Sequence, residues 1–408
     1  MKPVIAGVIG CGNISRFHFS GLEKAGARIK WVCDLNAAAA RPWADKFGAT
    51  CTADFRQLLA DPEVTLVDVT TVSAVHKTIC LAAIAAGKAV ICEKTLAENP
   101  DDALEIVQAA AAKGTILYTS YMKRFMPAMA KAKELLPALG RIITTHIRAH
   151  QCWGDQWGEN PKEGFFFTPP DGKSLVRKNY GGGILVCGGS HLLDLVGFFL
   201  GRPHRLYATV HTPAGRDYDI LAAALLETAN GVVHYEALAH PLNKIGFLRD
   251  GWDEHVQITG ANGRLDVYSA LWDDPLHKVS VLVHYDNATG ESREYRFDAV
   301  SPFDEAMRFF CANLAQGQQG AQPRTTGYDV DELIAHLQRS AATGQAVTVA
   351  YHGAKKFAES MRRRVLDAAS GMGYAPNLAA REIRHGPTFH ERQRRPHPIN
   401  STTEVTHP

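Results

Sequence analysis

Short apolar runs alternate with longer helical segments in the first 120 residues. The apolar or β-branched runs cover residues 4–9, 29–33, 66–70, 89–92 and 115–119, and the Ala- and Leu-rich segments between them cover residues 16–25, 37–47, 76–86 and 101–113. Such runs are typical of strands buried on both faces of a parallel sheet. Residues 1–124 are therefore predicted to form an α/β Rossmann domain, a doubly wound parallel sheet with its ligand at the carboxyl ends of the strands.

The pattern changes after about residue 140, where strand signals follow one another without intervening helices. They cover residues 141–149, 205–211, 220–227, 232–239, 254–259, 264–268, 278–284 and 293–297, with a last one at 346–350. Turn signals such as Asn230-Gly231 and Asn262-Gly263 separate some of them, which is typical of antiparallel strands. Helical periodicity returns at residues 303–315 and 330–342. Residues 125–352 are predicted to form an α+β domain with a large open, mostly antiparallel sheet.

Composition agrees with two globular domains. The chain has 408 residues, of which 46% are hydrophobic and 21% charged, so it holds enough apolar material for two cores. The longest apolar stretch, residues 183–201, is interrupted by His191 and Asp194 and is not expected to span a membrane. The start of the chain reads directly as a strand, without a leader, and the eight cysteines lack disulfide or zinc spacing. We expect a cytoplasmic protein with reduced thiols.

Residues 353–408 have their own composition. They carry ten Lys and Arg against five Asp and Glu, whereas residues 1–352 carry 34 against 37. This basic C-terminal extension ends in a stretch rich in Pro, His and Arg that is expected to be partly disordered.

A glycine pattern follows the first predicted strand and opens a helix. It comprises Gly10, Cys11, Gly12, Asn13 and Ile14, with Ser15 in place of a third glycine. In this context, the glycines permit a tight turn and a close approach of a pyrophosphate to the helix N-terminus. Asp34 ends the second strand, where a carboxylate would accept from a ribose 2′-hydroxyl and repel a 2′-phosphate. The pattern predicts NAD as cofactor, with NADP less favoured.

Two further motifs carry candidate chemistry. Glu93 and Lys94 follow the strand at residues 89–92, where a lysine ammonium could polarise a substrate oxygen during hydride transfer. In a glycine-rich helix start, Cys187, His191 and Asp194 are spaced to share one face of an α-helix. A histidine suits accepting a hydroxyl proton as a hydride leaves. The alternatives are a solvated surface lysine and a satisfied core histidine.

Several motifs, in the same order, resemble those of the Gfo/Idh/MocA family, named for glucose–fructose oxidoreductase, inositol dehydrogenase and a rhizopine-catabolism protein. They are the fingerprint after the first strand, residues 86–94, 121–127 and 181–194, and the segment from Thr326 to Gln345. The resemblance covers roughly residues 3–350. It implies a Rossmann domain joined to an open-faced sheet domain, with a homo-oligomer, a dimer or tetramer, formed through that sheet. It also implies that Lys94 polarises the substrate, that His191 moves the proton, and that Thr71 and His76 lie near the cofactor with Glu93.

Two positions depart from the family pattern. The family usually has proline after the lysine, often with a cis bond, where this chain has Thr95. Because a non-proline cis bond costs about 2.5–4 kcal/mol, we expect a trans peptide and a shifted Lys94. The family's catalytic aspartate corresponds to Cys187, which cannot orient His191 as a carboxylate does unless the thiol is ionised. Three interpretations stay open: His191 acts without a carboxylate partner, Cys187 contributes to catalysis, or the reaction is not simple alcohol oxidation.

The loop before the glycine-rich helix holds candidate substrate residues, because indole rings beside polar groups suit stacking on a pyranose. The candidates for binding substrate are Arg148, Trp153, Asp155, Lys178 and Tyr180, together with Lys94, His191 and Asp194. Alternatively, the aromatic residues pack against the sheet or a neighbouring subunit. No basic cluster argues for a phosphorylated substrate, and no metal-ligand spacing occurs.

The basic extension carries a second, short resemblance. Residues 362–381 are similar to the end of a lactose-repressor-type DNA-binding domain, including its Gly-Tyr-x-Pro-Asn. No helix-turn-helix pair precedes them, so the helix that reads the major groove is missing. We do not expect nucleic-acid or membrane binding. A fusion remnant or an arm that clasps a neighbouring subunit fits this segment better.

Three functions are compatible with these motifs. The first is an NAD-dependent oxidoreductase acting on a carbinol of a sugar, sugar derivative or inositol, a role in carbohydrate metabolism. The second is an NAD-dependent enzyme that cleaves or eliminates from a glycoside through transient oxidation of the sugar. The third is a non-catalytic NAD-sensing module. We favour the first.

Overall fold

The computed structural model describes residues 3–157, 182–214, 216, 218–269 and 278–349, and the structure is discussed for those residues alone. The chain divides into a unit of residues 1–351 and a unit of residues 352–408, and every described residue belongs to the first. The predicted substrate residues Lys178 and Tyr180, and the basic extension, lie outside the described residues.

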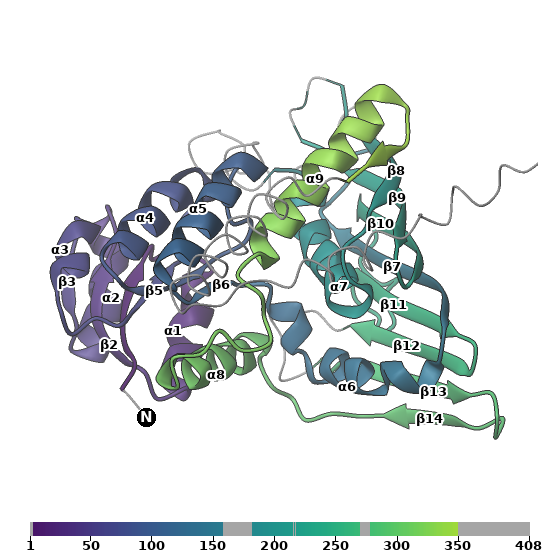
Figure 1. The fold of residues 1–408 in the computed structure, drawn as a ribbon, viewed down its shortest axis with the longest axis horizontal. Coiled ribbons are helices and arrows are strands. Elements are labelled where there is room, and N and C mark those ends of the chain that lie inside the picture. Colours follow the sequence, from purple (N-terminus) through teal and green to yellow (C-terminus); the bar gives the residue numbers. More distant parts are fainter. Residues whose placement is uncertain (1–2, 158–181, 215, 217, 270–277, 350–408) are drawn as a thin grey trace, which may run out of the picture. The chain divides into compact units, whose positions relative to one another are not determined.

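The N-terminal half of the described chain forms a parallel sheet of six strands. Its members are β1 (Ile5–Ile9), β2 (Arg28–Cys33), β3 (Thr50–Thr52), β4 (Leu66–Val69), β5 (Ala89–Cys92) and β6 (Leu117–Thr119), and its order is β3-β2-β1-β4-β5-β6. The helices of this region are α1 (Ser15–Lys24), α2 (Ala37–Phe47), α3 (Phe55–Ala60), α4 (Ser73–Ala85) and α5 (Pro100–Lys113) (Figure 1). The order reverses between β1 and β4, the position at which open α/β sheets bind ligands. The predicted Rossmann fold is confirmed.

Local sequence explains these elements. The central strands β4 and β5 are buried at every position, as their apolar residues require, and the burial includes Asp68 of β4. Asn99 accepts a hydrogen bond from the Asp102 amide at the start of α5, where Pro100 occupies the first turn. Gly48 ends α2 with a φ of 61°, a conformation that favours glycine. The sequence analysis missed β3 and α3, because a three-residue edge strand and a six-residue helix carry too little periodicity.

A second sheet follows, with nine strands in the described ranges. It contains β7 (Ile142–Cys152), β8 (Arg205–His211), β9 (Leu221–Thr228), β10 (Gly231–His240), β11 (Trp252–Gly260), β12 (Gly263–Ser269), β13 (Val281–Asp286), β14 (Ser292–Tyr295) and β15 (Val347–Thr348). Its order is β14-β13-β12-β11-β7-β10-β9-β8-β15, and β7 and β10 run parallel while the other neighbours are antiparallel. The predicted mostly antiparallel sheet is confirmed.

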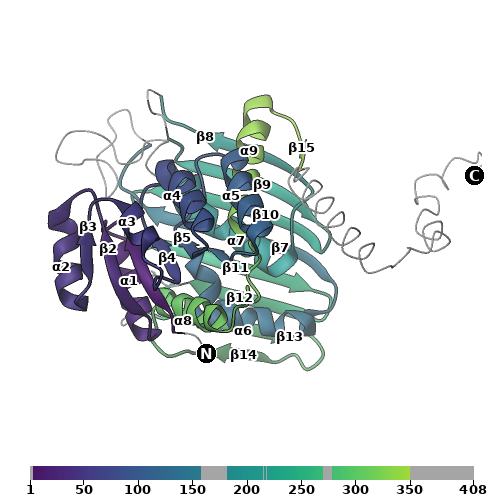
Figure 2. The ribbon, with the colours of Figure 1, turned by 60° about the vertical axis from the view of Figure 1, so that its left-hand side comes forward.

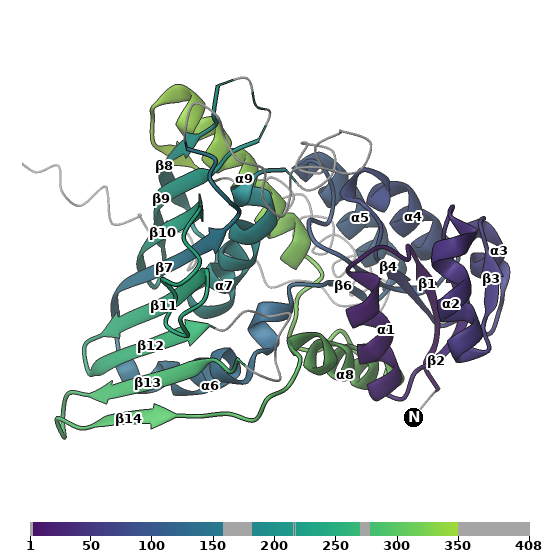
Figure 3. The ribbon, with the colours of Figure 1, turned by 180° about the vertical axis from the view of Figure 1, so that it is seen from behind.

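Helices cover one face of this second sheet. They are α6 (Pro127–Leu135), α7 (Ser190–Leu200) and α9 (Thr326–Thr343), which lie between the two sheets in Figures 2 and 3. Along β7, the residues facing these helices, such as Ile147 and Ala149, are buried, whereas the intervening His146 and Arg148 face the other side. The other face of this sheet, which is turned away from the first domain, is called the open face below.

The helix α8 (Pro302–Ala315) follows the second sheet in sequence but packs on the first. Met307 and Phe310 join the apolar core that contains Phe19 of α1, and Phe310 stacks on Tyr118 of β6 with ring centroids 4.4 Å apart. A Cβ at Gly21 would lie 2.7 Å from the Met307 side chain, so α1 needs glycine there for this close approach. The C-terminal half of the chain thus completes the core of the N-terminal domain (Figure 3).

Two further features concern the state of the cysteines and the length and apolarity of the helices. All eight cysteines lie in the described ranges and are free thiols. Within those ranges, no helix combines the length and the apolarity needed to cross a bilayer.

Candidate active site

A cavity of about 610 Å³ opens at the carboxyl ends of β1, β2 and β4. It is lined mainly by apolar and small side chains: Ile9, Gly10, Gly12, Asn13, Ile14, Cys33, Asp34, Leu35, Ala53, Phe55, Thr70, Thr71, Val72, Val75, Thr78 and Ile79. Gly10 has a φ of 100°, and a Cβ there would lie 2.8 Å from the Thr70 carbonyl. A Cβ at Gly12 would meet no described atom within 4 Å, so the backbone there faces open space. These features fit a dinucleotide lying over the glycine turn.

Asp34 fixes the glycine turn as well as lining the cavity. One oxygen of its carboxylate accepts the Cys11 amide at 2.7 Å, and the other accepts the Asn36 amide at 2.7 Å. The Cys11 thiol is directed toward the Cys33 carbonyl, and burial, followed by the Asp34 charge, raises its pKa to about 12. The hydroxyl of Ser15 donates to the Gly12 carbonyl at 2.7 Å, so serine replaces the third glycine without loosening the turn. Cys11 therefore contributes its backbone amide to the glycine turn.

The buried His76 links the cofactor cavity to the loop that carries Lys94. Its Nδ1 lies 2.9 Å from the Thr95 carbonyl oxygen and its Nε2 lies 3.1 Å from the Thr71 carbonyl oxygen. Thr71 lines the cavity, and Thr95 directly follows Lys94. The ring is fully buried outside the cavity lining and lies between the two loops, where its single N–H in the neutral form donates to one of these carbonyls.

Lys94 lies where strand β5 ends and extends toward the second domain. Its Nζ donates to the carbonyl oxygen of Cys187 at 3.1 Å. The Lys94–Thr95 peptide bond is cis, so the expectation of a trans bond is wrong. Lys94 therefore contacts the backbone of Cys187. Within the described residues, its ammonium makes no hydrogen bond to the Cys187 thiol.

The segment that holds Cys187 is not the regular α-helix that the sequence analysis expected. Residues Leu185–Gly189 form one turn of π-helix before α7 begins at Ser190. In a π-helix, hydrogen bonds run to the fifth residue instead of the fourth. The glycines allow this tight placement, since a Cβ at Gly188 or Gly189 would collide with Gln151 or with the Tyr235 hydroxyl. Cys187 thus lies in the π-turn and His191 in the α-helix that follows it, and their shared face stays a prediction.

His191 lies in the first turn of α7, with 8% of its surface exposed. Its ring meets the Tyr121 ring edge to face at 5.7 Å, and its Nδ1 has no hydrogen-bond partner among the described residues. Burial, followed by the charges of Lys94 and Lys123, lowers the pKa of His191 well below its ordinary value. The imidazole is neutral at physiological pH and has a lone pair that can accept a proton.

Asp194 does not orient His191. Its carboxylate is buried in a two-pronged ion pair with Arg124, whose Nε donates to Oδ2 at 2.9 Å while a second guanidinium nitrogen donates to Oδ1. Arg124 belongs to the short 3₁₀ helix η1 (Met122–Phe125). This pair joins η1 to α7 and holds the His191 helix in place, while no carboxylate of the described residues is hydrogen-bonded to His191.

A second buried ion pair lies beside the cluster. Lys123 of η1 donates to Glu254 of β11, and the other oxygen of Glu254 accepts from the Gln151 amide at 2.9 Å. Gln151 in turn accepts the indole N–H of Trp153 at 3.2 Å, and Trp153 has no exposed surface. The predicted sugar-stacking Trp153 is thus part of the core that supports Glu254.

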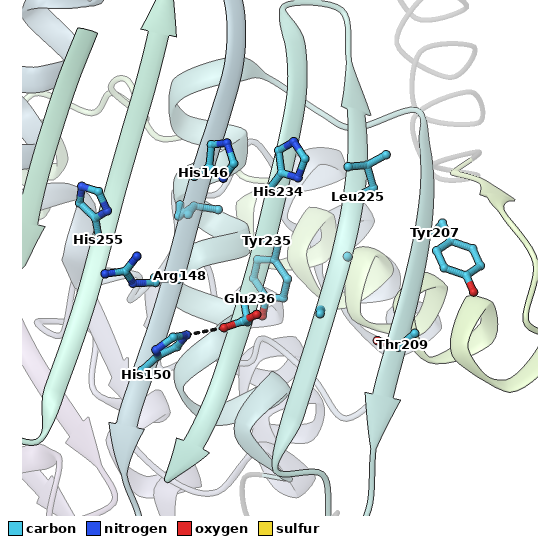
Figure 4. Close-up of a pocket in the computed structure, with 13 residues that line it drawn as sticks. His146, Arg148, His150, Tyr207, Thr209, Leu225, His234, Tyr235, Glu236 and His255 are labelled. Carbon is cyan, nitrogen blue, oxygen red and sulfur yellow. Dashed lines mark hydrogen bonds and ion pairs between the residues drawn. The ribbon is translucent and has the colours of Figure 1, made fainter. Parts of the chain in front are cut away.

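The structure does not bring two other predicted substrate residues to this cluster. Arg148 pairs with Asp253 on the open face of the second sheet, in a cavity of about 520 Å³ that it shares with several histidines (Figure 4). In the same view, the helices lie behind the sheet. Asp155 accepts the Trp157 amide at 3.2 Å, which shapes the end of the described loop. The alternation of side chains along β7 places Arg148 on the face of the sheet opposite the helices, away from His191.

Glu93 is buried with a partner that the sequence analysis did not consider. Its Oε1 lies 2.9 Å from Nε2 of His18, and its Oε2 accepts the Lys94 amide at 3.1 Å. Tyr121, Lys123, Glu254 and His18 were all missed as site residues. For Tyr121 and Lys123 a signal existed, because both belong to the motif at residues 121–127, whereas His18 and Glu254 stand in ordinary amphipathic patterns.

Comparisons with known proteins agree with this geometry. A family model described as "Oxidoreductase family, NAD-binding Rossmann fold" matches residues 4–121, and one described as "GFO/IDH/MocA C-terminal domain" matches residues 129–266. Inositol 2-dehydrogenase 2 of Saccharopolyspora erythraea is 26% identical over 84% of this chain and 94% of its own length. The 1,5-anhydro-D-fructose reductase of Ensifer adhaerens is 27% identical over 84% of this chain and 98% of its own length.

A solved structure adds evidence on the fold. The complex of levoglucosan dehydrogenase with NADH and levoglucosan superposes with a TM-score of 0.72. The two chains share 20% sequence identity, and the match covers 86% of this chain and all of that one.

Proposed function

Since the chain belongs to the Gfo/Idh/MocA family of NAD-binding oxidoreductases, close to inositol dehydrogenases and related sugar dehydrogenases, we propose that it oxidises or reduces a carbinol of a sugar, sugar derivative or inositol. One observation carries this proposal. Lys94 reaches the turn before the helix of the neutral His191, and its own loop borders the cavity proposed for the dinucleotide. The two relatives named above are a dehydrogenase and a reductase of compounds of this class.

The roles of the side chains follow from their chemistry. A nicotinamide bound in this fold supplies hydride acceptance or donation at a carbinol carbon. The Lys94 ammonium has donors beyond the one given to Cys187, and it can hydrogen-bond the substrate oxygen as charge develops there. A ring nitrogen of His191 accepts the hydroxyl proton during oxidation and returns it during reduction. Burial, followed by the charges of Lys94 and Lys123, keeps His191 neutral and able to take that proton.

We propose NAD over NADP because of Asp34. Its carboxylate is held at the cavity by two backbone amides, and lone pairs remain for ribose hydroxyls, whereas a 2′-phosphate would meet a fixed negative charge. Binding of NADH and NADPH to the wild type and Asp34→Ala, followed by fluorescence, tests this. We expect the variant to lose about tenfold in NADH affinity and most of the preference over NADPH. Asp45→Ala, at an exposed position of α2, is the matched control.

The substrate class is tested with a panel of hexoses, pentoses, inositols and anhydro sugars. NADH formed in a one-to-one ratio with the oxidised product is the expected result. Turnover of a glycoside without net NADH would favour transient oxidation instead, the second function considered from the sequence. Binding of NADH with no turnover across the panel would favour the sensing module.

We also propose that a second copy of the chain covers the open face of the second sheet. Tyr207 and Leu225 line the cavity on this face, and Leu225 is 41% exposed although it stands in the middle of a strand (Figure 4). A sheet with one covered face and exposed apolar side chains on the other is a common self-association surface. Light scattering after size exclusion should give a dimer or larger, and Leu225→Asp should lower the mass to that of the monomer. An unchanged mass would contradict this interface.

A further inference from the structure

A buried histidine in the first domain lies between two carboxylates directly beside the proposed site. His18, on α1, has no exposed surface. Its Nδ1 lies 3.0 Å from both carboxylate oxygens of Asp68, which stands inside β4. Its Nε2 lies 2.9 Å from Oε1 of Glu93, just past β5. The two carboxylates are thus joined by one ring.

The charge of this ring follows from its partners. A neutral imidazole has one N–H and would present its lone pair to one of the two carboxylates, whereas an imidazolium donates to both. Burial alone lowers the pKa of His18, but the Asp68 charge and the hydrogen bonds to Asp68 and Glu93 outweigh it and raise the pKa to about 10. For Glu93, burial raises the pKa, but the His18 hydrogen bond and the His18 and Lys94 charges lower it overall. The triad therefore carries two negative charges and one positive charge.

The second oxygen of Glu93 connects this triad to Lys94. It accepts the Lys94 amide at 3.1 Å, so both oxygens of Glu93 are engaged, one by His18 and the other by the backbone of the proposed substrate-polarising lysine. The Lys94 side chain then reaches Cys187 of the second domain. A rotation of Glu93 would release the Lys94 backbone, and the bond between Glu93 and His18 opposes that rotation.

We propose that His18 is a positioning residue for Lys94: through the bond from its Nε2, it locks the Glu93 carboxylate that fixes the Lys94 backbone. The proposal rests on the proposed function of Lys94. It adds a residue that does not contact the substrate, since His18 is buried in the first domain. The negative triad also places an opposite charge near the Lys94 ammonium. Phe303 of α8, whose ring centroid lies 5.5 Å from that of His18, closes the other side.

Two substitutions at His18 separate positioning from simple packing. The amide nitrogen of glutamine takes roughly the place of Nε2, and that of asparagine the place of Nδ1. His18→Gln therefore keeps the bond to Glu93 and loses that to Asp68, whereas His18→Asn does the reverse. If His18 acts through Glu93, His18→Asn lowers kcat about tenfold or more with KM and NADH affinity little changed, and His18→Gln stays within about threefold of the wild type. His336→Gln, on α9, is the matched control.

A readout that needs no turnover accompanies the kinetics. Trace acylation of the apo protein, with the modified Lys94 peptide quantified by mass spectrometry, reports how firmly the lysine is held. We expect His18→Asn to change Lys94 labelling by about threefold or more and His18→Gln to leave it near the wild-type value. Lys77, on the surface of α4, serves as the internal reference lysine.

The outcomes separate the two proposals. Equal effects of the two variants on kcat and on labelling, or a larger effect of His18→Gln, would overturn the role of His18. A differential effect on Lys94 labelling, with no sugar oxidised by the wild type, would sustain the positioning of Lys94 while the proposed function fails.

Discussion

His18 and His191 are the same side chain in two opposite surroundings. Both rings are buried, and both lie near Lys94, but His18 is flanked by Asp68 and Glu93 whereas His191 is surrounded by the charges of Lys94 and Lys123. The first environment raises the histidine pKa to about 10 and the second lowers it well below its ordinary value. One ring is therefore a fixed cation and the other a neutral base.

The two histidine environments also differ in the structural elements that build them. His18, Asp68 and Glu93 come from three adjacent elements of one domain, α1, β4 and β5, so the Rossmann sheet alone builds that triad. The surroundings of His191 combine β5, η1 and α7, and so they form only when both sheets are in place. Lys94 is the residue that the two environments share.

Removing Lys94 should have the largest effect, because it lies between the two histidines and is the proposed donor to the substrate oxygen. Lys94→Ala is expected to lower kcat/KM by roughly a thousandfold, the cost of losing a transition-state hydrogen-bond donor. Initial rates with the best substrate of the panel measure this. Lys77→Ala, which removes a surface ion pair with Asp102, should leave the rate unchanged. Full activity of Lys94→Ala would remove the lysine from the mechanism.

Replacing the neutral histidine should come next. His191→Asn is expected to lower kcat by about a hundredfold as the general base is lost. Because burial and the charges of Lys94 and Lys123 lower the pKa of His191 below its ordinary value, the acid limb of kcat/KM for oxidation should lie below pH ~6.5. A pH–rate profile with an acid limb centred above that value would contradict the neutral assignment.

The cationic histidine should appear in the stability of the fold. Its pKa is raised on folding, so its stabilisation is complete below the unfolded-state value of about 6.5 and disappears as the pH rises through about 10. In that window the wild type should lose up to roughly 1.4 kcal/mol of unfolding free energy per pH unit more than His18→Gln does. Urea unfolding at pH 6, 8 and 9.5 measures the difference. Parallel pH dependences of the two proteins would argue against an imidazolium at His18.

The smallest effect is expected outside both environments. Arg148→Ala removes an ion pair with Asp253 on the open face of the second sheet, and kcat and KM should stay within about twofold of the wild type. The same kinetic assay serves. A large rise in KM would return Arg148 to the substrate site and would mean that the open face takes part in binding.

Much of the first domain was predictable because its signals are local. The apolar runs and the fingerprint at Gly10 and Gly12 each report on residues near them in sequence, and the repeated strand and helix signals predicted a doubly wound parallel sheet. The strands of the second sheet were also found within a few residues of their ends. The short elements β3 and α3, and the helix α6, gave too little periodicity to be seen.

The site was only partly predictable. Lys94 and His191 were found because each stands in a recognisable motif, and the structure brings the lysine to the helix that carries the histidine. The substrate roles of Trp153 and Arg148 were inferred from residue type. Burial places Trp153 in the core, and strand alternation places Arg148 on the open face of the second sheet. The π-turn at Leu185–Gly189 depends on packing against Gln151 and Tyr235, which lie on other strands.

By itself, the sequence determined which residues could do chemistry here and which fold would carry them, because glycine turns, strand runs and motifs are properties of neighbouring residues. Only the tertiary structure decided their charge and their partners. Whether a histidine is a cation or a base depends on which carboxylates or ammonium groups surround it, and those come from elements as far apart in the chain as His18 and Glu93 or Lys94 and His191.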